Sequence, residues 1–260
     1  MLIDRAIEQF QGISLSEMDE VKLMNRTDRK YWFHIDLLAG LLEDVAPYYY
    51  ILEVNGKRNL PYSTTYYDTK GDEMYQNHHR GKMNRYKVRR RNYISTNSSF
   101  LEVKFKSNKG RTVKVRKSSD YQNTSFNAED EVFIRENTPY SCCDLKSVLV
   151  NGFRRLMLVS KAMNERCTID SELRFRSDEG EAALNDLTIV EVKTDGRSYS
   201  KIIEALNLRR LRPSGFSKYC MGRSLTQSSL KQNNFKEKHR TIDKRLNNPI
   251  NNINLWTLNG

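Results

Sequence analysis

The sequence lacks a long hydrophobic run, and this absence excludes an integral membrane protein. No stretch of the 260 residues approaches the roughly 18 consecutive apolar residues that cross a bilayer. The N-terminus also lacks the apolar core of a secretory signal peptide. We therefore expect a soluble, cytoplasmic protein that would reach a membrane only through a membrane protein partner.

Cysteine is scarce and does not show the spacing of metal ligands. The four cysteines are Cys142, Cys143, Cys167 and Cys220. Because two of them are adjacent and no export signal is present, reduced thiols are expected. His78 and His79 are also adjacent and do not share a helix face, so they do not favour a zinc site. Surface or packing roles are expected for both histidines.

Acidic residues are the minority among the charged residues. Lysine and arginine outnumber aspartate and glutamate 44 to 32, which gives a formal net charge of +12. Residues 224–260 carry six basic and two acidic residues, so +8 remains on residues 1–223. An excess spread over the body of the chain favours an anionic partner, such as nucleic acid, an anionic membrane or a phosphate-rich ligand.

The chain shows no internal repeat and no clear linker, which favours one α+β domain over residues 1–223. Helices are expected near 3–10, 34–47, 70–80, 143–152, 199–207 and 216–225. Strands are expected near 26–34, 48–54, 62–69, 85–93, 99–107, 111–118, 156–163, 166–175 and 187–194. Residues 224–260 form a polar, basic tail with little to bury, so we expect it to be flexible, with Trp256 as a potential anchor.

Basic residues alternate with apolar residues in six of the expected strands. In "YKVRRR", Val88 opposes Lys87, Arg89 and Arg91, because successive strand residues point to opposite faces. The same alternation recurs in "RTDRK", "LEVKFK", "TVKVRK", "RCTIDSELRF" and "IVEVK". An antiparallel sheet with one face in water is the simplest interpretation of any single strand.

The six strands taken together favour a different interpretation. Like charges that lie directly opposite on neighbouring strands repel and destabilise a sheet. A sheet that curls around a polyanion would offset this repulsion. We therefore predict an α+β fold with an antiparallel β-barrel tunnel of about eight strands, a charged interior and helices packed outside.

Six ordered blocks between about residues 20 and 222 resemble a known family. They are "RTDRKYWFH", "KVRRRNY", "FLEVKFKSNKGRTVKVR", "RCTID", "IVEVKTDG" and "RPSGFSKY". These blocks resemble the catalytic domain of the vacuolar transporter chaperone (VTC) polyphosphate polymerases, within the triphosphate tunnel metalloenzyme (CYTH-like) superfamily. The resemblance implies transfer of the ATP γ-phosphate to a growing polyphosphate chain with manganese or magnesium.

The resemblance also assigns site residues. It implies that the catalytic tunnel residues are Lys30, Arg89, Arg91, Lys104, Lys114, Arg166 and Lys218. Substrate contacts are expected from Arg26, Lys87, Arg116, Lys161, Lys193 and Ser217. Lys161 takes the place of a further tunnel arginine of the family. Arg26 stands where the wider superfamily has a glutamate, which resembles the VTC branch and argues against a plain triphosphatase.

Four acidic residues are candidate metal ligands, since hard cations prefer carboxylate oxygens. Glu191 matches the metal-binding glutamate of the family, although a salt bridge to a neighbouring lysine or arginine is the alternative. Metal binding and ion pairing are equally plausible for Glu102. Asp28 and Asp170 are weaker candidates, and a structural role is the alternative for Asp170.

Three functions remain open on the sequence. The first is an ATP-dependent polyphosphate polymerase, with ATP and polyphosphate as its ligands. The second is another enzyme of the tunnel type, such as an inorganic triphosphatase. The third is a non-catalytic module that binds polyphosphate or nucleic acid. Nucleic acid is not expected, because stacking on single strands requires exposed aromatic residues interleaved with the basic ones. No phosphate-sensing domain is recognised, so we expect any translocation to involve other proteins.

Overall fold

The computed structural model describes residues 2–19, 27–121, 125–196 and 199–246, and the chain divides into two compact units. Unit 1 comprises Met1–Pro61, Phe153–Leu173 and Leu184–Phe216, and unit 2 comprises Tyr62–Gly152, Arg174–Ala183 and Ser217–Gly260. Two long strands, β8 (Leu145–Ser160) and β9 (Glu165–Arg176), contribute residues to both units.

The strands pair antiparallel, apart from the short parallel pair of β1 (Gln11–Ile13) and β3 (Tyr49–Leu52). Unit 1 has the order β1-β3-β8-β9-β11-β2, with β2 at Thr27–His34 and β11 at Leu187–Thr194. Unit 2 has the order β8-β4-β5-β6-β7, and β10 (Glu181–Leu184) pairs with β9. The bounds in unit 2 are Leu60–Thr69 for β4, Arg85–Tyr93 for β5, Ser98–Lys106 for β6 and Thr112–Ser119 for β7.

The predicted α+β class with an antiparallel sheet is therefore confirmed. Among the described residues, β2 and β7 each end the order of paired strands, so backbone hydrogen bonds do not close the sheet into a ring. The short elements are α2 (Leu15–Asp19) and the 3-10 turns Ile35–Leu37, Ala46–Tyr48, Ile94–Thr96 and Cys142–Asp144.

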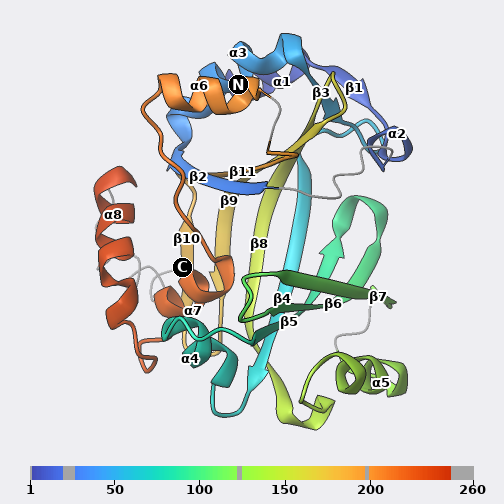
Figure 1. Cartoon of the computed structure of the whole chain (residues 1–260), viewed down its shortest axis with the longest axis vertical. Helices are drawn as coiled ribbons and strands as arrows, with labels where there is room; N and C mark the ends of the chain where they lie inside the picture. The colour runs from blue at the N-terminus through green and yellow to red at the C-terminus, as the bar shows by residue number, and fades with distance from the viewer. Residues whose placement is uncertain (1, 20–26, 122–124, 197–198, 247–260) are drawn as a thin grey trace. The chain divides into compact units, whose positions relative to one another are not determined.

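Three helices cover one face of the sheet in unit 1 (Figure 1). They are α1 (Leu2–Glu8), α3 (Leu38–Val45) and α6 (Lys201–Leu208). Leu38, Leu41, Leu42 and Val45 recur at helical spacing and are buried, which gives α3 one apolar face. Their core partners from the sheet are Tyr31, Phe33, Cys167, Ile169, Val190 and Val192. The opposite face of these strands carries the charged residues.

Unit 2 repeats this arrangement with other helices. Val88, Leu101 and Val103 form a core with Ile134 of α5 (Ala128–Asn137) and Met74 of α4 (Glu73–His79). A capping box begins α5, in which the Asn127 side chain accepts a hydrogen bond from the backbone of Asp130 at 2.8 Å. Helices thus cover part of the apolar face of β5–β7, whereas Val113 of β7 is 55% exposed. The lysine row lies on the other face, but Arg90 and Lys117 lie on the helix-covered face, where both pair with Asp130 of α5.

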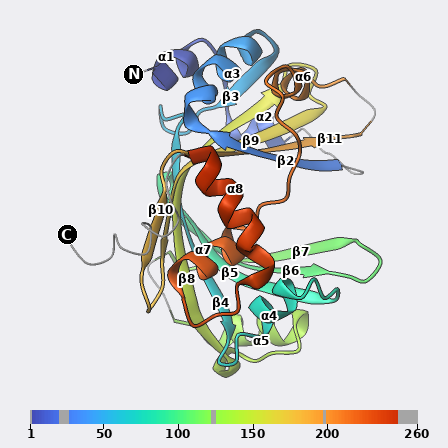
Figure 2. The same ribbon diagram turned by 90° about the vertical axis from the view of Figure 1, so that its left-hand side faces the viewer.

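The C-terminal part of unit 2 contains α7 (Lys218–Thr226), a 3-10 turn (Asn233–Phe235) and α8 (Lys236–Leu246). Helix α8 lies beside α7 (Figure 2), and the His239 Nε2 atom is 2.9 Å from the Ser224 hydroxyl. Ile242 and Leu246 of α8 are buried. Residues 236–246 of the expected tail therefore form a packed helix, because these residues supply an apolar face. Trp256 lies outside the described residues.

The predicted helix at 143–152 is wrong, because Leu145–Ser160 forms one strand of 16 residues. Its Val148 and Val150 are β-branched and suit a pleated strand that neighbours pair on both sides. Helix α7 comes close to this strand at Gly222, where an added Cβ would lie 2.6 Å from a Leu149 carbon and 2.5 Å from Phe175. None of the helices in the described residues is long and apolar enough to cross a bilayer.

Candidate anion-binding site

Strands β5, β6 and β7 carry basic residues in rows across one face of unit 2. Lys87 lies opposite Lys104, which in turn lies opposite Lys114. In the next row, Arg89 and Arg116 flank Glu102 from either side. The predicted alternation is confirmed by this register, since the apolar residues between these positions form the core on the other face. Three lysines side by side repel one another, so the row favours a bound anion.

Glu102 is the carboxylate in the middle of this face. Its side chain is only 1% exposed, and it accepts a hydrogen bond from Arg89 Nε at 2.7 Å. Lys114 forms a second ion pair with it. Burial opposes the charged form, but Arg89, Arg91 and Lys114 outweigh burial and lower the pKa of Glu102 to about 2. The structure therefore places Glu102 in ion pairs, which was one of the two roles open on the sequence.

The lysines of this face are perturbed in the opposite direction. Burial, together with the charges of neighbouring cations, lowers the pKa of Lys87 to about 8. Burial lowers the pKa of Lys114 to about 8 as well, although Glu102 opposes the shift. A polyanion bound at this face would favour the charged form of both lysines.

The start of α7 lies at the same face. Ser217 caps the helix, because its hydroxyl accepts a hydrogen bond from the Cys220 backbone N–H at 3.3 Å. Lys87 donates to the same hydroxyl at 3.1 Å. Lys218 stands in the first turn of the helix. The helix start thus adds backbone N–H groups and two predicted residues, Ser217 and Lys218, to the basic face of unit 2.

Polar and aromatic side chains border the arginines. Arg91 Nε donates to the Thr64 hydroxyl at 3.4 Å, and the Arg116 guanidinium lies 4.6 Å from the Phe100 ring centroid. Such contacts hold the planar guanidinium groups in fixed orientations, which suits bidentate binding of phosphate.

Unit 1 carries a second basic face. Lys30 of β2 lies opposite Glu191 of β11, and the two side chains form an ion pair. The Lys193 Nζ is 3.9 Å from the other carboxylate oxygen of Glu191. In the neighbouring row, Lys193 lies between Asp28 and Arg166. The predicted sharing of one face by these residues is confirmed, and Glu191 is held by lysines on both sides.

Arg155 of β8 also belongs to this face, although the sequence did not single it out. Its guanidinium donates two hydrogen bonds to Asp170, at 2.5 and 2.8 Å. Asp170 is 3% exposed, so this bidentate pair is buried. In the sequence, Arg155 was indicated only by its place in the adjacent pair Arg154 and Arg155. The side chains of such a pair point to opposite faces of a strand. Arg154 pairs with Glu172 instead, at 3.3 Å.

The remaining predicted residues lie in different surroundings. Lys161 is exposed in the turn after β8, with its Nζ 5.7 Å from the Tyr50 ring centroid. Arg166 is half-buried, and its guanidinium donates to the Met18 carbonyl. Asp28 is exposed near the start of β2. Arg26 lies outside the described residues.

The described residues contain no cluster of three or more His, Cys, Asp or Glu side chains that could hold a metal ion. Magnesium, however, is commonly held by one or two carboxylates together with substrate phosphates and water. Glu191 has a side chain that is 22% exposed, so it fits this mode. Asp170 fits it less well, because Arg155 already engages both of its oxygens.

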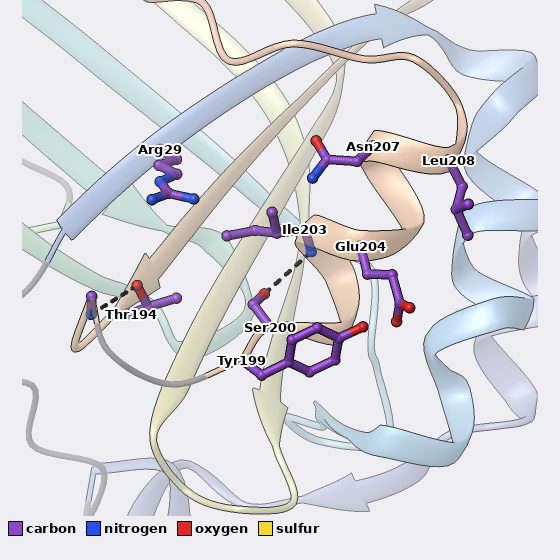
Figure 3. A pocket seen from close by; sticks show the side chains of 9 residues that line it. Arg29, Thr194, Tyr199, Ser200, Ile203, Glu204, Asn207 and Leu208 are labelled. Carbon is purple, nitrogen blue, oxygen red and sulfur yellow. Dashed lines mark hydrogen bonds between the residues drawn. The ribbon is translucent and has the colours of Figure 1, made fainter.

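A groove of about 480 Å³ lies elsewhere on unit 1, between the end of β11 and α6 (Figure 3). Arg29 and Thr194 line one side, and Tyr199, Glu204 and Leu208 line the other. None of the predicted site residues lines this groove. Arg29 alternates with Lys30 along β2, so the groove is on the helix-covered face and separate from the basic one.

Comparisons with known proteins give a family match and several similar solved structures. The family model described as "VTC domain" matches residues 25–227. No curated protein matches the chain. A Bacillus halodurans protein assigned as an adenylate cyclase has 11% identity and a TM-score of 0.48, covering 75% of this chain and 96% of its own. A Hippeastrum protein described as an adenylyl cyclase with a dominant triphosphatase activity has 15% identity and a TM-score of 0.48, with coverages of 80% and 99%.

Proposed function

The chain belongs to the VTC domain family, and we propose that it is an ATP-dependent polyphosphate polymerase. In this proposal, the γ-phosphate of ATP is transferred to the end of a growing polyphosphate chain, and ADP is released. Family membership supports the broader conclusion that the chain is an enzyme that acts on triphosphates. The observation that supports the more specific assignment, a polyphosphate polymerase, is the row Lys87–Lys104–Lys114. Three like charges lie directly opposite one another in this row.

An extended row of cations suits an extended ligand. Adjacent rows along the strands are about 7 Å apart, because each residue of a strand advances about 3.3 Å. Rows of basic residues from Lys87 to Arg91 can therefore contact different phosphates along one chain. A polyphosphate chain with one charge per phosphate would gain binding free energy from every row. A single phosphate ion would gain binding free energy from only one row.

Phosphoryl transfer requires in-line positioning and neutralisation of the phosphoryl oxygens more than it requires a covalent group of the protein. We assign these roles to Arg89, Arg91 and Lys104 on the basic face of unit 2. The attacking group would be a terminal phosphate oxygen of the acceptor chain, which is already anionic near neutral pH. We therefore assign no general base.

We propose Glu191 as the carboxylate that would hold a divalent cation, with phosphate oxygens and water as further ligands. Such a cation, manganese or magnesium, would neutralise charge on the phosphoryl oxygens. Lys30 and Lys193 contact the same carboxylate, so they orient it.

The test is incubation of the purified protein with ATP and Mn²⁺ or Mg²⁺, with and without a short polyphosphate primer. Gel electrophoresis is expected to show ATP-derived chains. Release of inorganic phosphate without chains would mean that water is the acceptor and would overturn the polymerase assignment in favour of a triphosphatase. Binding of polyphosphate without turnover of ATP would leave a binding module.

Matched variants make this test specific to the basic face. Lys104→Ala is expected to reduce chain synthesis, because Lys104 is exposed in the middle of the lysine row. Lys109→Ala is the control, since Lys109 is an exposed lysine in the turn between β6 and β7. Equal activity of the two variants would contradict the assignment of this face.

A further inference from the structure

One group of cations in unit 2 lies beyond the residues that the family resemblance assigns. Arg85 and Lys106 lie directly opposite each other, one row before the pair Lys87–Lys104. Neither belongs to the predicted site. Because the two are like charges in one cross-strand pair, they destabilise the free sheet unless an anion lies nearby.

Helix α8 brings another cation to the same place. Lys238 of α8 is half-buried, and burial lowers its pKa, whereas the nearby Cys220 opposes the shift. Cys220 also interacts with Lys87 and Arg85. Helix α8 packs on α7 through the pair His239–Ser224 at 2.9 Å, and Lys87 of β5 contacts Ser217 at the start of α7 at 3.1 Å. Lys238 and the start of β5 therefore both lie beside α7. The family match ends at residue 227, so α8 lies outside it.

His78 belongs to α4, on which the segment before α8 packs: Asn234 donates from its backbone N–H to His79 Nε2 at 3.2 Å and from its side chain to the His79 carbonyl at 2.9 Å. Burial and the charges of Lys87, Arg85, Lys106 and Lys238, in that order, lower the pKa of His78 to about 2. Its ring is therefore neutral at physiological pH. The buried Nδ1 atom has no hydrogen-bond partner among the described residues. Such an atom is costly unless a ligand or water satisfies it.

We propose that Arg85, Lys106 and Lys238 form a second phosphate subsite around His78, and that α8 extends the polyphosphate-binding face by one row. This inference rests on the proposed function only in its choice of ligand. The ligand of this subsite is a phosphate group of a long polyphosphate chain, another part of which occupies the row Lys87–Lys104. It lies about 7 Å further along the strands, by the spacing of two strand residues.

A subsite at the end of a row predicts dependence on chain length. A short ligand such as tripolyphosphate can occupy the central rows alone, whereas a chain of tens of phosphates also covers the outer row. Lys238 should therefore contribute to the binding of long chains and contribute little to the binding of tripolyphosphate. A purely structural role for Lys238 would affect both ligands equally.

The experiment measures dissociation constants for tripolyphosphate and for long-chain polyphosphate by titration calorimetry, without ATP. Lys238→Ala is expected to weaken long-chain binding about tenfold, which corresponds to about 1.4 kcal/mol. Its affinity for tripolyphosphate should remain within about twofold of that of the native protein. Lys238→Arg keeps the charge and should restore long-chain binding.

Lys244→Ala is the matched control, because Lys244 is exposed on the same helix. The inference is overturned if Lys238→Ala and Lys244→Ala bind long chains alike, or if Lys238→Ala loses both ligands equally. Native protein that binds neither phosphate ligand would overturn it as well. Native protein that binds long chains but does not synthesise them would refute the polymerase assignment, while the chain-length effect would still support the subsite.

Discussion

Glu102 gives the sharpest test of the charge balance in unit 2. Its carboxylate is buried between Arg89 and Lys114, and these charges hold its pKa at about 2, below the ordinary value of 4.5. Since the pKa is lowered in the folded state, the stability that it contributes is fully present above about pH 4.5 and is lost as the pH falls towards 2. This lowering of the pKa corresponds to a contribution of about 3 kcal/mol to the free energy of unfolding at neutral pH.

Replacement of Glu102 by Gln removes this charge with little change in volume. We expect Glu102→Gln to lower the free energy of unfolding by about 3 kcal/mol, which is about 6–12 °C in the melting temperature of a protein of this size. Polyphosphate should then raise the melting temperature of Glu102→Gln more than that of the native protein, because the ligand replaces the missing negative charge. The assay is thermal unfolding at pH 7 with EDTA, with and without tripolyphosphate.

Glu129→Gln is the control for this experiment. Glu129 is 80% exposed and pairs with Lys117, which lies on the opposite face of β7. The variant Glu129→Gln should change the melting temperature little, since exposed ion pairs contribute about 0–1 kcal/mol to the free energy of unfolding. The reasoning is refuted if Glu102→Gln melts like the control, or if tripolyphosphate stabilises Glu102→Gln no more than it stabilises the native protein.

Three further predictions concern pH, a buried ion pair and the metal. Titration calorimetry should show that polyphosphate affinity falls as the pH rises from 7 through 8 to 9.5. The reason is that Lys87 and Lys114 have a pKa of about 8 in the free protein and are charged when they bind. An affinity that is constant over this range would contradict the assignment of these lysines to the binding face. Arg155→Ala should lower the free energy of unfolding by about 3 kcal/mol, because Asp170 stays buried after losing two hydrogen bonds, and denaturant titration should show partial recovery when Asp170→Asn is added. Glu191→Gln should lose the Mn²⁺ dependence of chain synthesis, and an unchanged metal titration would exclude Glu191 as the ligand.

The basic face of unit 2 was predictable because the strands there alternate without interruption. In β5 the predicted and observed bounds coincide at residues 85 and 93, so every side chain falls on its expected face. A shift of one residue would have moved the arginines into the core. The two hairpins that join β5, β6 and β7 are short, so strands that follow one another in sequence also pair.

The charged residues of β8 were harder to assign from the sequence. The strand ends at Ser160, whereas the predicted strand continued to residue 163, and Lys161 therefore lies in a turn. Arg155 was missed because a pair of adjacent arginines does not indicate which of the two faces the site. Its partner Asp170 is fixed only by the hairpin of β8 and β9, which local pattern does not specify.

The two basic faces share one feature that alternation alone did not reveal. Each has a carboxylate held between cations, Glu102 in unit 2 and Glu191 in unit 1. One carboxylate cannot neutralise the row of lysines and arginines around it, so repulsion persists in the free protein. A bound polyanion would relieve that repulsion and stabilise the fold by mass action. Stabilisation by polyphosphate should therefore exceed that by an equal concentration of a neutral polyol, and it should weaken at high salt, because exposed charges are screened.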